Sequence, residues 1–331
     1  MLLPDRRFGV LFVLFIAIAA AGESKALRQQ AEELWAKAEA VSKLDPQKMS
    51  PYHEEATFTL YGLSTGDLKG KYHKEFADEN DWVEEFRAGD YQQLSIHKAK
   101  DLYKHENSEF TPHSVELLAT ALASQKFGFL PHEKVHKIRQ GKVGDVDASC
   151  IESEITDAGF PLKRLTCFSQ ADGTLLSEEF MQHTVLRSRY QPLDGKLLPT
   201  HVEVQQAGVK RADADLTYRE DPGLSAAMIK VPAGMQPEHQ CTQITTPKLQ
   251  SRADPIIPDS YAGKPLHSTV TLEIVVGTDG RVKSSFVTET AGAELDHIAQ
   301  QAVRQWRFKP SLCDGMPKQV KVQVEVNFRG M

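Results

Sequence analysis

The strand pattern near the end of the chain constrains its fold more than any other feature. Apolar residues recur at every second position of Val320–Phe328, and the same period marks Thr269–Val276 as an earlier strand. The two glycines of Gly277–Gly280 supply the positive φ angles of a tight hairpin, so Arg281–Glu289 is expected to fold back antiparallel. Between this hairpin and the last strand, the segment Leu295–Trp306 places its apolar residues on one stripe of a helix. An apolar sheet face and an apolar helix stripe predict a two-layer ββαβ unit.

A short aromatic motif follows the predicted helix. It reads W-R-F-K-P over residues 306–310, and a glycine-rich hairpin and a Gly-Met-Pro turn accompany it. On these residues, the region 245–331 resembles the C-terminal domain of TonB-family proteins of bacterial envelopes. The structural motif that the resemblance assigns comprises Trp306, Phe308, Pro310 and Gly280. One departure is that residues 254–258 read Asp-Pro-Ile-Ile-Pro, where the family has a Tyr-Pro pair.

The same resemblance implies a function for the last strand. In TonB-family domains, an extended segment of an outer-membrane receptor is captured by strand addition, in which main-chain hydrogen bonds provide affinity. On this chain the corresponding edge is Lys318–Phe328. The polar side chains expected to contribute specificity are Lys321, Gln323, Glu325 and Asn327. The implied partner is an outer-membrane receptor or another envelope protein, and the alternative use of the edge is homodimerisation.

Composition excludes one class of partner. The chain has 331 residues, of which 40% are hydrophobic and 25% charged, which is ordinary for a globular protein with room for two domains. Its formal net charge is −6, so it has no basic field for nucleic acid. Protein or lipid partners are therefore expected.

The first residues indicate the compartment. Arg6 and Arg7 precede an apolar run over residues 8–21, and small residues precede the polar stretch that begins at Gly22. These are the three regions of a secretory signal peptide. The run is shorter than the roughly twenty residues that span a bilayer, which favours a cleaved signal over a short N-terminal anchor. Either alternative predicts that the remainder lies in the periplasm.

A second unit is expected between the signal and the TonB-like region. Ser24–Leu44 has the apolar stripe of a helix, and a second helix is expected over His113–Ser124. Strand-like segments joined by Gly, Asp or Pro turns fill the rest. They are Ala56–Gly62, Leu68–Ala77, Trp82–Arg87, Gln92–Lys98, Val143–Glu154, Leu165–Ser169, Leu175–Met181, Val185–Tyr190, Thr200–Gln206 and Ala212–Tyr218. This order predicts a strongly curved antiparallel sheet wrapped around a helix.

The hairpin LDGKLLPTHVEV, at Leu193–Val204, is similar to strands of LolA-like lipoprotein-carrier proteins. The predicted fold is therefore α+β, with an N-terminal curved antiparallel half-barrel and the C-terminal two-layer ββαβ unit. The second resemblance implies a lipid or acyl ligand on the concave face. The candidate lining residues are Phe58, Leu60, Trp82, Phe86, Ile96 and Leu102. The alternative is that they form core against the helix that carries Trp35.

Prolines divide the chain between its two units. They interrupt regular structure from Pro232 to Pro258. The predicted organisation is a signal peptide or short anchor at 1–22, a LolA-like half-barrel at 23–235, a proline-containing linker at 236–258 and a TonB-like domain at 259–331.

The four cysteines suit an oxidising compartment. Cys150 and Cys167 lie in strand-like segments on either side of a turn, which would place their thiols nearly opposite each other. Cys241 and Cys313 could close a second disulfide from the linker to a loop of the TonB-like domain. Sequence does not fix this connectivity, and the alternative is that the first two are buried thiols.

One motif points to a different class of function. Residues 132–136 read His-Glu-Lys-Val-His and match H-E-x-x-H, in which two histidines on one helix face hold zinc and the glutamate activates water. Only about nine residues between Pro131 and Gly141 are available for that helix, and Glu152 or Glu154 would have to supply a third ligand. No other catalytic signature is present. The favoured interpretation is a non-enzymatic envelope protein without a cofactor, linked to outer-membrane transport; the alternative is a zinc-dependent hydrolase using His132, Glu133 and His136.

Overall fold

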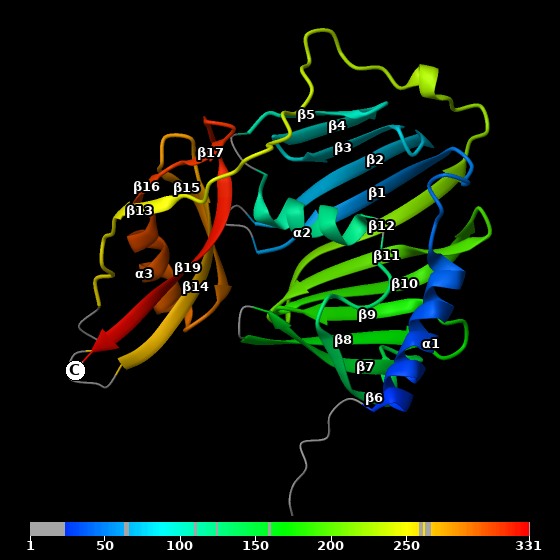
Figure 1. Cartoon of the computed structure of the whole chain (residues 1–331), viewed down its shortest axis with the longest axis horizontal. Helices are drawn as coiled ribbons and strands as arrows, with labels where there is room; N and C mark the ends of the chain where they lie inside the picture. Colours follow the sequence, from blue (N-terminus) through cyan, green and yellow to red (C-terminus); the bar gives the residue numbers. More distant parts are fainter. Residues whose placement is uncertain are drawn as a thin grey trace, which may run out of the picture.

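Twelve antiparallel strands of the N-terminal region form one curved sheet (Figure 1). The computed structural model describes residues 24–62, 66–108, 111–123, 125–157, 160–257, 261 and 266–330. The strands are β1 (Tyr52–Leu60), β2 (Leu68–Asp78), β3 (Asp81–Ala88), β4 (Tyr91–Lys98), β5 (Asp101–Glu106), β6 (Glu133–Val143), β7 (Val146–Asp157), β8 (Phe160–Ser169), β9 (Leu175–Phe180), β10 (His183–Leu193), β11 (Lys196–Gln206) and β12 (Val209–Glu220). The predicted signal peptide at 1–22 lies outside the described residues.

The sheet consists of two meanders that meet at one seam. Its strand order is β5-β4-β3-β2-β1-β12-β11-β10-β9-β8-β7-β6, so every neighbouring pair except β1 and β12 is consecutive in the chain. At the seam, Phe58 pairs with Ala214 and Leu60 with Ala212. Strands β5 and β6, which the sequence analysis did not predict, form the two edges of the sheet.

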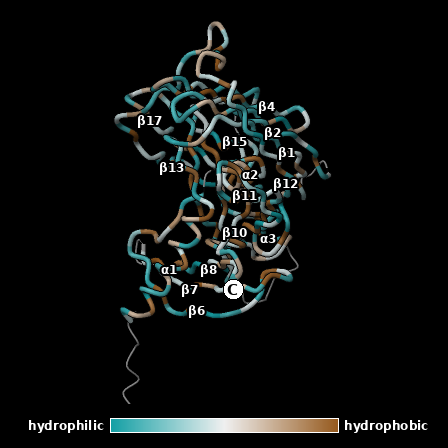
Figure 2. The backbone as a smooth tube through the Cα atoms, turned by 90° about the vertical axis from the view of Figure 1, so that its right-hand side faces the viewer, coloured by the Kyte–Doolittle hydropathy of each residue, from teal (hydrophilic) through white to brown (hydrophobic). Residues whose placement is uncertain are grey.

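Two helices pack on one face of this sheet, which we call the inner face. Helix α1 (Lys25–Ser42) begins at Ser24, whose hydroxyl accepts from the Leu27 amide, and it buries Trp35 against β6–β9. Helix α2 (His113–Leu122) buries Leu118 against β1, β2, β11 and β12. Both helices lie over the sheet in Figure 1. Figure 2 shows hydrophobic (brown) and hydrophilic (teal) residues interspersed along the chain.

The opposite, outer face is partly covered by the chain that follows β12. This segment contains the short 3-10 helix η1 (Ala226–Met228). Leu224 and Ile229 pack there with Ala77 and Ile96, and Pro237 forms an isolated bridge with Tyr103 of β5. Ile96 therefore belongs to an outer-face cluster, which corrects its prediction as part of a concave ligand site.

The C-terminal region has its own small sheet and core. Its elements are β13 (Lys248–Ser251), β14 (Leu266–Val276), β15 (Val282–Glu289), α3 (Ala293–Arg304), β16 (Arg307–Lys309), β17 (Ser311–Cys313), β18 (Met316–Lys318) and β19 (Val320–Gly330). The three-stranded sheet has the order β15-β14-β19, while β13 pairs with β16 and β17 with β18. The apolar stripe of α3, including Leu295, Ala299 and Val303, packs with the alternating apolar residues of β14 and β19. The short strands β13, β16, β17 and β18 were not predicted.

Both predicted disulfides are present. Cys150 bonds Cys167 between the paired strands β7 and β8. Cys241 bonds Cys313, which joins the segment before β13 to β17. Within the described residues, no helix is both long enough and apolar enough to cross a membrane. The coarse prediction of an α+β chain with an N-terminal curved antiparallel sheet is confirmed.

Candidate functional site

The edge of strand β19 is the first candidate site. β19 pairs with β14 along its length, and no other strand of the described residues pairs with its opposite side. Gln323, Glu325 and Asn327 are exposed, whereas Val326 and Phe328 are buried in the C-terminal core. The main-chain groups on the unpaired side are therefore available to an added strand.

Space lies beside the C-terminal end of this edge. A pocket of about 440 Å³ separates Asn327 and Arg329 of β19 from residues 252–257 of the segment that precedes the sheet. Within that segment, Ile256 is 85% exposed. An isolated exposed apolar residue is ordinary on a protein surface, so the pocket marks room beside the strand and not a binding site by itself.

The other end of β19 contacts the N-terminal region. Lys321 forms an ion pair with Glu116 of α2, and its ammonium lies 3.7 Å from Glu273 of β14. His113, the first residue of α2, places Nδ1 3.2 Å from the Glu273 carboxylate and stacks on Phe286 of β15 at 3.8 Å between ring centroids. Figure 1 shows the small sheet next to α2. Of the four predicted partner-binding side chains, Lys321 is thus engaged within the chain.

A pocket at this contact holds a second of those four side chains. It has a volume of about 300 Å³, and Lys321, Gln323 and Glu289 line its C-terminal side, while Phe180 and Met181 line its N-terminal side. Met181 is half exposed. The N-terminal half of β19 is therefore flanked by the N-terminal sheet, whereas Glu325 and Asn327 are absent from this pocket's lining.

The aromatic motif after α3 is structural. Trp306 is 3% exposed, and its Nε1–H donates to the Ala253 carbonyl at 2.9 Å. The Phe308 amide donates to the Gly280 carbonyl at 2.8 Å. Gly280 has a φ of +74°, and a Cβ built there would lie 1.9 Å from the Phe308 carbonyl oxygen. Only glycine therefore allows the hairpin to approach β16 this closely. Pro310 lies between β16 and β17.

A cavity on the inner face of the N-terminal sheet is the second candidate site. It measures about 560 Å³ and lies between β2, β3, α2 and the chain after α1. Its lining residues are Pro46, Tyr72, Lys74, Phe76, Glu79, Trp82, Glu84, Phe86, Ala119 and Ala123. A neighbouring cavity of about 230 Å³ shares Pro46, Lys74 and Ala123. A largely apolar cleft with a few convergent charges is the usual form of a small-molecule site.

Three charged side chains form a row across these cavities. Lys74 of β2 is paired in register with Glu54 of β1 and with Glu84 of β3. Burial raises the pKa of Glu54 to about 7 and raises the pKa of Glu84, while Lys74 opposes both shifts. The Lys74 ammonium lies 5.5 Å from the Trp82 ring centroid. At neutral pH the inner face therefore carries a carboxyl group that is only partly ionised.

The sequence identified this cavity only in part. Trp82 and Phe86 line it, whereas Phe58 and Leu60 are buried in the core under α2. Leu102 lies on edge strand β5. The alternative that these residues form core is confirmed for Phe58 and Leu60, but the helix above them is α2, because Trp35 of α1 lies at the β6–β9 end of the sheet. The charged row was missed, although inward positions of alternating strands that carry Glu or Lys are a signal that could have revealed it.

The proposed zinc-binding helix does not exist. Glu133–Val143 is the edge strand β6, and His132 precedes it with a φ of +61°. Four residues along a strand span about 13 Å, compared with about 6 Å between neighbouring turns of a helix. Within the described part of the chain, no group of three candidate metal ligands includes His132 or His136.

Glu133 instead has a structural role. Its carboxylate accepts from Arg164 at 2.9 Å, from the Ser153 hydroxyl at 2.5 Å and from the Leu130 amide at 2.7 Å. The Arg164 side chain is 3% exposed and also pairs with Glu178 at 2.8 Å. A carboxylate that is fully used by buried donors cannot act as the general base of a hydrolase.

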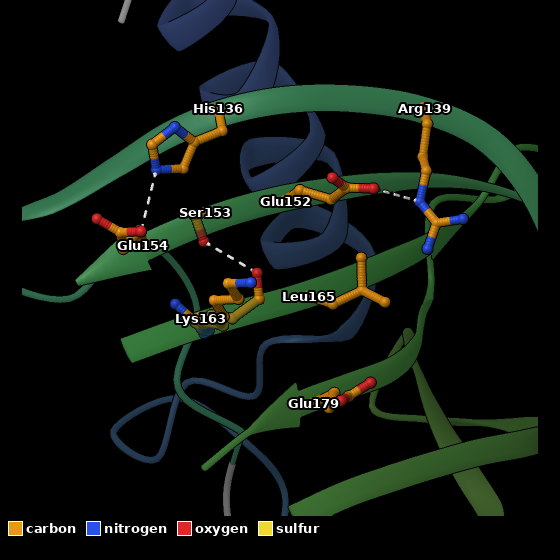
Figure 3. A pocket seen from close by; sticks show the side chains of 9 residues that line it. His136, Arg139, Glu152, Ser153, Glu154, Lys163, Leu165 and Glu179 are labelled. Atoms are coloured by element: carbon orange, nitrogen blue, oxygen red, sulfur yellow. Dashed lines mark hydrogen bonds and ion pairs between the residues drawn. The ribbon is translucent and has the colours of Figure 1, made fainter. Parts of the chain in front are cut away.

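The surface around His136 is a shallow, charged pocket of about 420 Å³ (Figure 3). His136 faces Glu154 at 3.8 Å, and Arg139 pairs with Glu152 at 2.6 Å. Lys163 and Glu179 line the pocket beside Leu165. The two glutamates considered as a third zinc ligand, both on β7, are thus paired with two different residues of the adjacent strand β6.

Comparison with known proteins supports the C-terminal resemblance. Residues 258–329 match the family model described as "Gram-negative bacterial TonB protein C-terminal". The chain is 24% identical over 82 residues to Protein TonB of Vibrio cholerae, a match that covers 24% of this chain and 34% of that relative. The chain therefore spans about a third of the length of this curated relative. The predicted resemblance of the C-terminal region to TonB-family proteins is confirmed.

Solved structures resemble the N-terminal region only distantly. A LolA superfamily protein from Nitrosomonas europaea is 13% identical with a TM-score of 0.38, and the match covers 61% of this chain and 97% of that protein. A DUF1329 family protein from Desulfovibrio piger is also 13% identical, with a TM-score of 0.41 and coverage of 61% and 96%. The LolA group that the N-terminal sequence resembles is thus represented among these matches.

Proposed function

We propose that this chain is a non-enzymatic periplasmic protein that captures an extended segment of an outer-membrane or other envelope protein along β19. The observation that carries the proposal is the unpaired side of β19, within the region that matches the TonB C-terminal model. An antiparallel or parallel segment can pair with its main chain, and Glu325 and Asn327 would contact neighbouring side chains of that segment. Homodimerisation through the same edge is the competing outcome.

We further propose that the N-terminal half-barrel holds an apolar ligand, such as a lipid acyl chain, in its inner-face cavity. Support comes from the aromatic lining and the 560 Å³ volume. The proposed organisation remains a half-barrel at 23–235, a linker at 236–258 and a TonB-like domain at 259–331. Helix α2 contacts both the cavity and the C-terminal sheet, through Ala119 on one side and Glu116 on the other.

The test of partner capture uses two pairs of charge changes. Gln323→Lys with Asn327→Lys adds two cations along β19 and leaves its Val and Phe face unchanged. The matched control, Gln301→Lys with Gln305→Lys, adds the same two charges in place of neutral amide side chains at exposed positions at the end of α3. Each immobilised protein is exposed to detergent-solubilised envelope proteins of the source bacterium, and captured proteins are quantified by mass spectrometry.

The expected result is at least one envelope protein retained by the wild type and by the α3 control but reduced about tenfold or more by the β19 pair. Peptides from that protein should then bind in fluorescence anisotropy with the same order of variants. Equal capture by both lysine pairs would refute strand addition at β19. A wild-type dimer in light scattering that the β19 pair alone converts to monomer would instead support homodimerisation.

A further inference from the structure

A cluster of two histidines and three carboxylates lies on the outer face of the N-terminal sheet, near the seam. His53 of β1 is paired in register with Glu75 of β2, and His73 of β2 is paired with Glu55 of β1. Their neighbours in sequence, including Tyr52 and Tyr72, are buried on the inner face, so the histidines and glutamates point outward. The fifth member, Asp221, follows the end of β12.

The spacing of three of these side chains suits a metal ion. The Glu75 Oε1 atom lies 3.3 Å from His73 Nε2 and 3.9 Å from His53 Nδ1. These three ligand atoms all lie within 4.8 Å of one another. Two ligands at zinc-bond lengths of about 2.0 Å in a tetrahedral shell lie about 3.3 Å apart. Small rotamer adjustments would therefore bring all three to one ion.

The far nitrogen of each imidazole faces a carboxylate. His53 Nε2 lies 2.8 Å from Asp221 Oδ2, and His73 Nδ1 lies 3.8 Å from Glu55 Oε1. At 2.8 Å, the Asp221 carboxylate can accept a hydrogen bond from the Nε2–H tautomer of His53. The lone pair of His53 is then on Nδ1, which points toward Glu75. Metal-binding histidines are oriented in this way by carboxylates behind them.

The cluster differs from other histidine–carboxylate contacts of the chain. His201 pairs with Asp215 at 2.8 Å without a second imidazole. Two other groups of candidate ligands exist in the described residues. In one of them Cys313 is bonded to Cys241, which removes its thiolate. In the other the Lys321 ammonium pairs with Glu116, so a cation already occupies that group.

We propose that His53 Nδ1, His73 Nε2 and Glu75 bind one Zn²⁺ ion, with water completing the coordination. Imidazole and carboxylate ligands suit zinc, and the ion would join β1 to β2 beside the β1–β12 seam. Asp221 and Glu55 act as positioning residues for the two imidazoles. The side chains of His53 and His73 are 14% and 38% exposed, so the site is accessible from solvent while one ligand is held firmly.

The test uses the full chain, purified without a histidine tag and stripped of metal with EDTA. Zinc is titrated into it, and binding is measured by isothermal titration calorimetry. We expect one equivalent of Zn²⁺ in the wild type, a loss of affinity of at least about tenfold in His73→Ala, and about tenfold in Asp221→Asn. His201→Ala, which removes a histidine paired with aspartate elsewhere, should bind zinc as the wild type does. Circular dichroism verifies that each variant is folded.

Two results would overturn the proposal. One is the absence of a saturable equivalent of zinc in the wild type. The other is unchanged affinity in folded His73→Ala and His73→Gln. If His201→Ala lost zinc as strongly as His73→Ala, binding would be scattered over surface histidines and the assigned site would be wrong.

Discussion

Replacement of Glu54 by Gln should change the pH dependence of stability. Glu54 is 5% exposed, and burial raises its pKa from the ordinary 4.5 to about 7. Because the pKa of Glu54 is higher in the folded state, folding favours the protonated side chain. Below about pH 4.5, Glu54 is protonated in both states, and its ionisation costs the fold nothing. The free energy of unfolding falls as the pH rises from about 4.5 through about 7, because the folded protein must then bury the charged carboxylate. A pKa change of this size corresponds to about 3 kcal/mol.

The effect of Glu54→Gln on stability should therefore differ between low and high pH. The stability of Glu54→Gln relative to the wild type should be greater at pH 8 than at pH 4, by up to about 3 kcal/mol. Any packing cost of the amide is independent of pH and cancels. Urea unfolding followed by tryptophan fluorescence measures both values, since Trp82 lines the same cavity.

Glu55→Gln is the matched control. Glu55 is the next residue of β1, on the outer face, with a side chain that is 70% exposed. Its replacement should give nearly the same stability difference at pH 4 and pH 8. If Glu54→Gln behaved like this control, Glu54 would be ionised at little cost in the folded state. The conclusion that burial of this charged row raises the pKa of Glu54 would then be wrong.

Two further predictions concern the cavity and the linker. Ala119→Trp fills the inner-face cavity and should weaken binding of a fluorescent fatty acid about tenfold or more, whereas Thr120→Trp, at an exposed position of the same helix, should not; equal binding by the two variants would exclude the cavity as the ligand site. Trypsin should cut after the exposed Arg252, and the Cys241–Cys313 disulfide should hold both fragments together until reductant is added; fragments that separate on a non-reducing gel would disprove the linkage.

Local pattern was sufficient to predict most helices and strands. Helix α1 begins after Ser24 because that residue caps it, and it ends just before Asp45-Pro46. Alternation placed β2 through β4 within one or two residues of their bounds. The long apolar alternation of β19 and the amphipathic stripe of α3 similarly depend on neighbours in sequence, so they could be recognised without knowledge of the fold.

Strand β6 was missed because its stability depends on distant residues. Only Val135 and Glu133 are fully buried in it, and a buried glutamate is favourable only because Arg164, from β8, pairs with it. The H-E-x-x-H motif at residues 132–136 therefore matched a helical, catalytic pattern when only its own segment was considered. The candidate sites have the same limitation. The row Glu54–Lys74–Glu84 and the pair His53–His73 are brought together by strand register, which one segment does not encode.

The position of the β1–β12 seam has a consequence for folding kinetics. Every other pairing in the twelve-stranded sheet joins consecutive strands, whereas Phe58 and Ala214 must meet from more than 150 residues apart. Closing a loop of that length costs about 3 kcal/mol more in chain entropy than closing a turn of about four residues. Each meander can form from local contacts, but the shared inner core under α2 requires residues from both. Assembly of this sheet is thus limited by one long-range closure, the kind of step that makes high-contact-order proteins fold slowly.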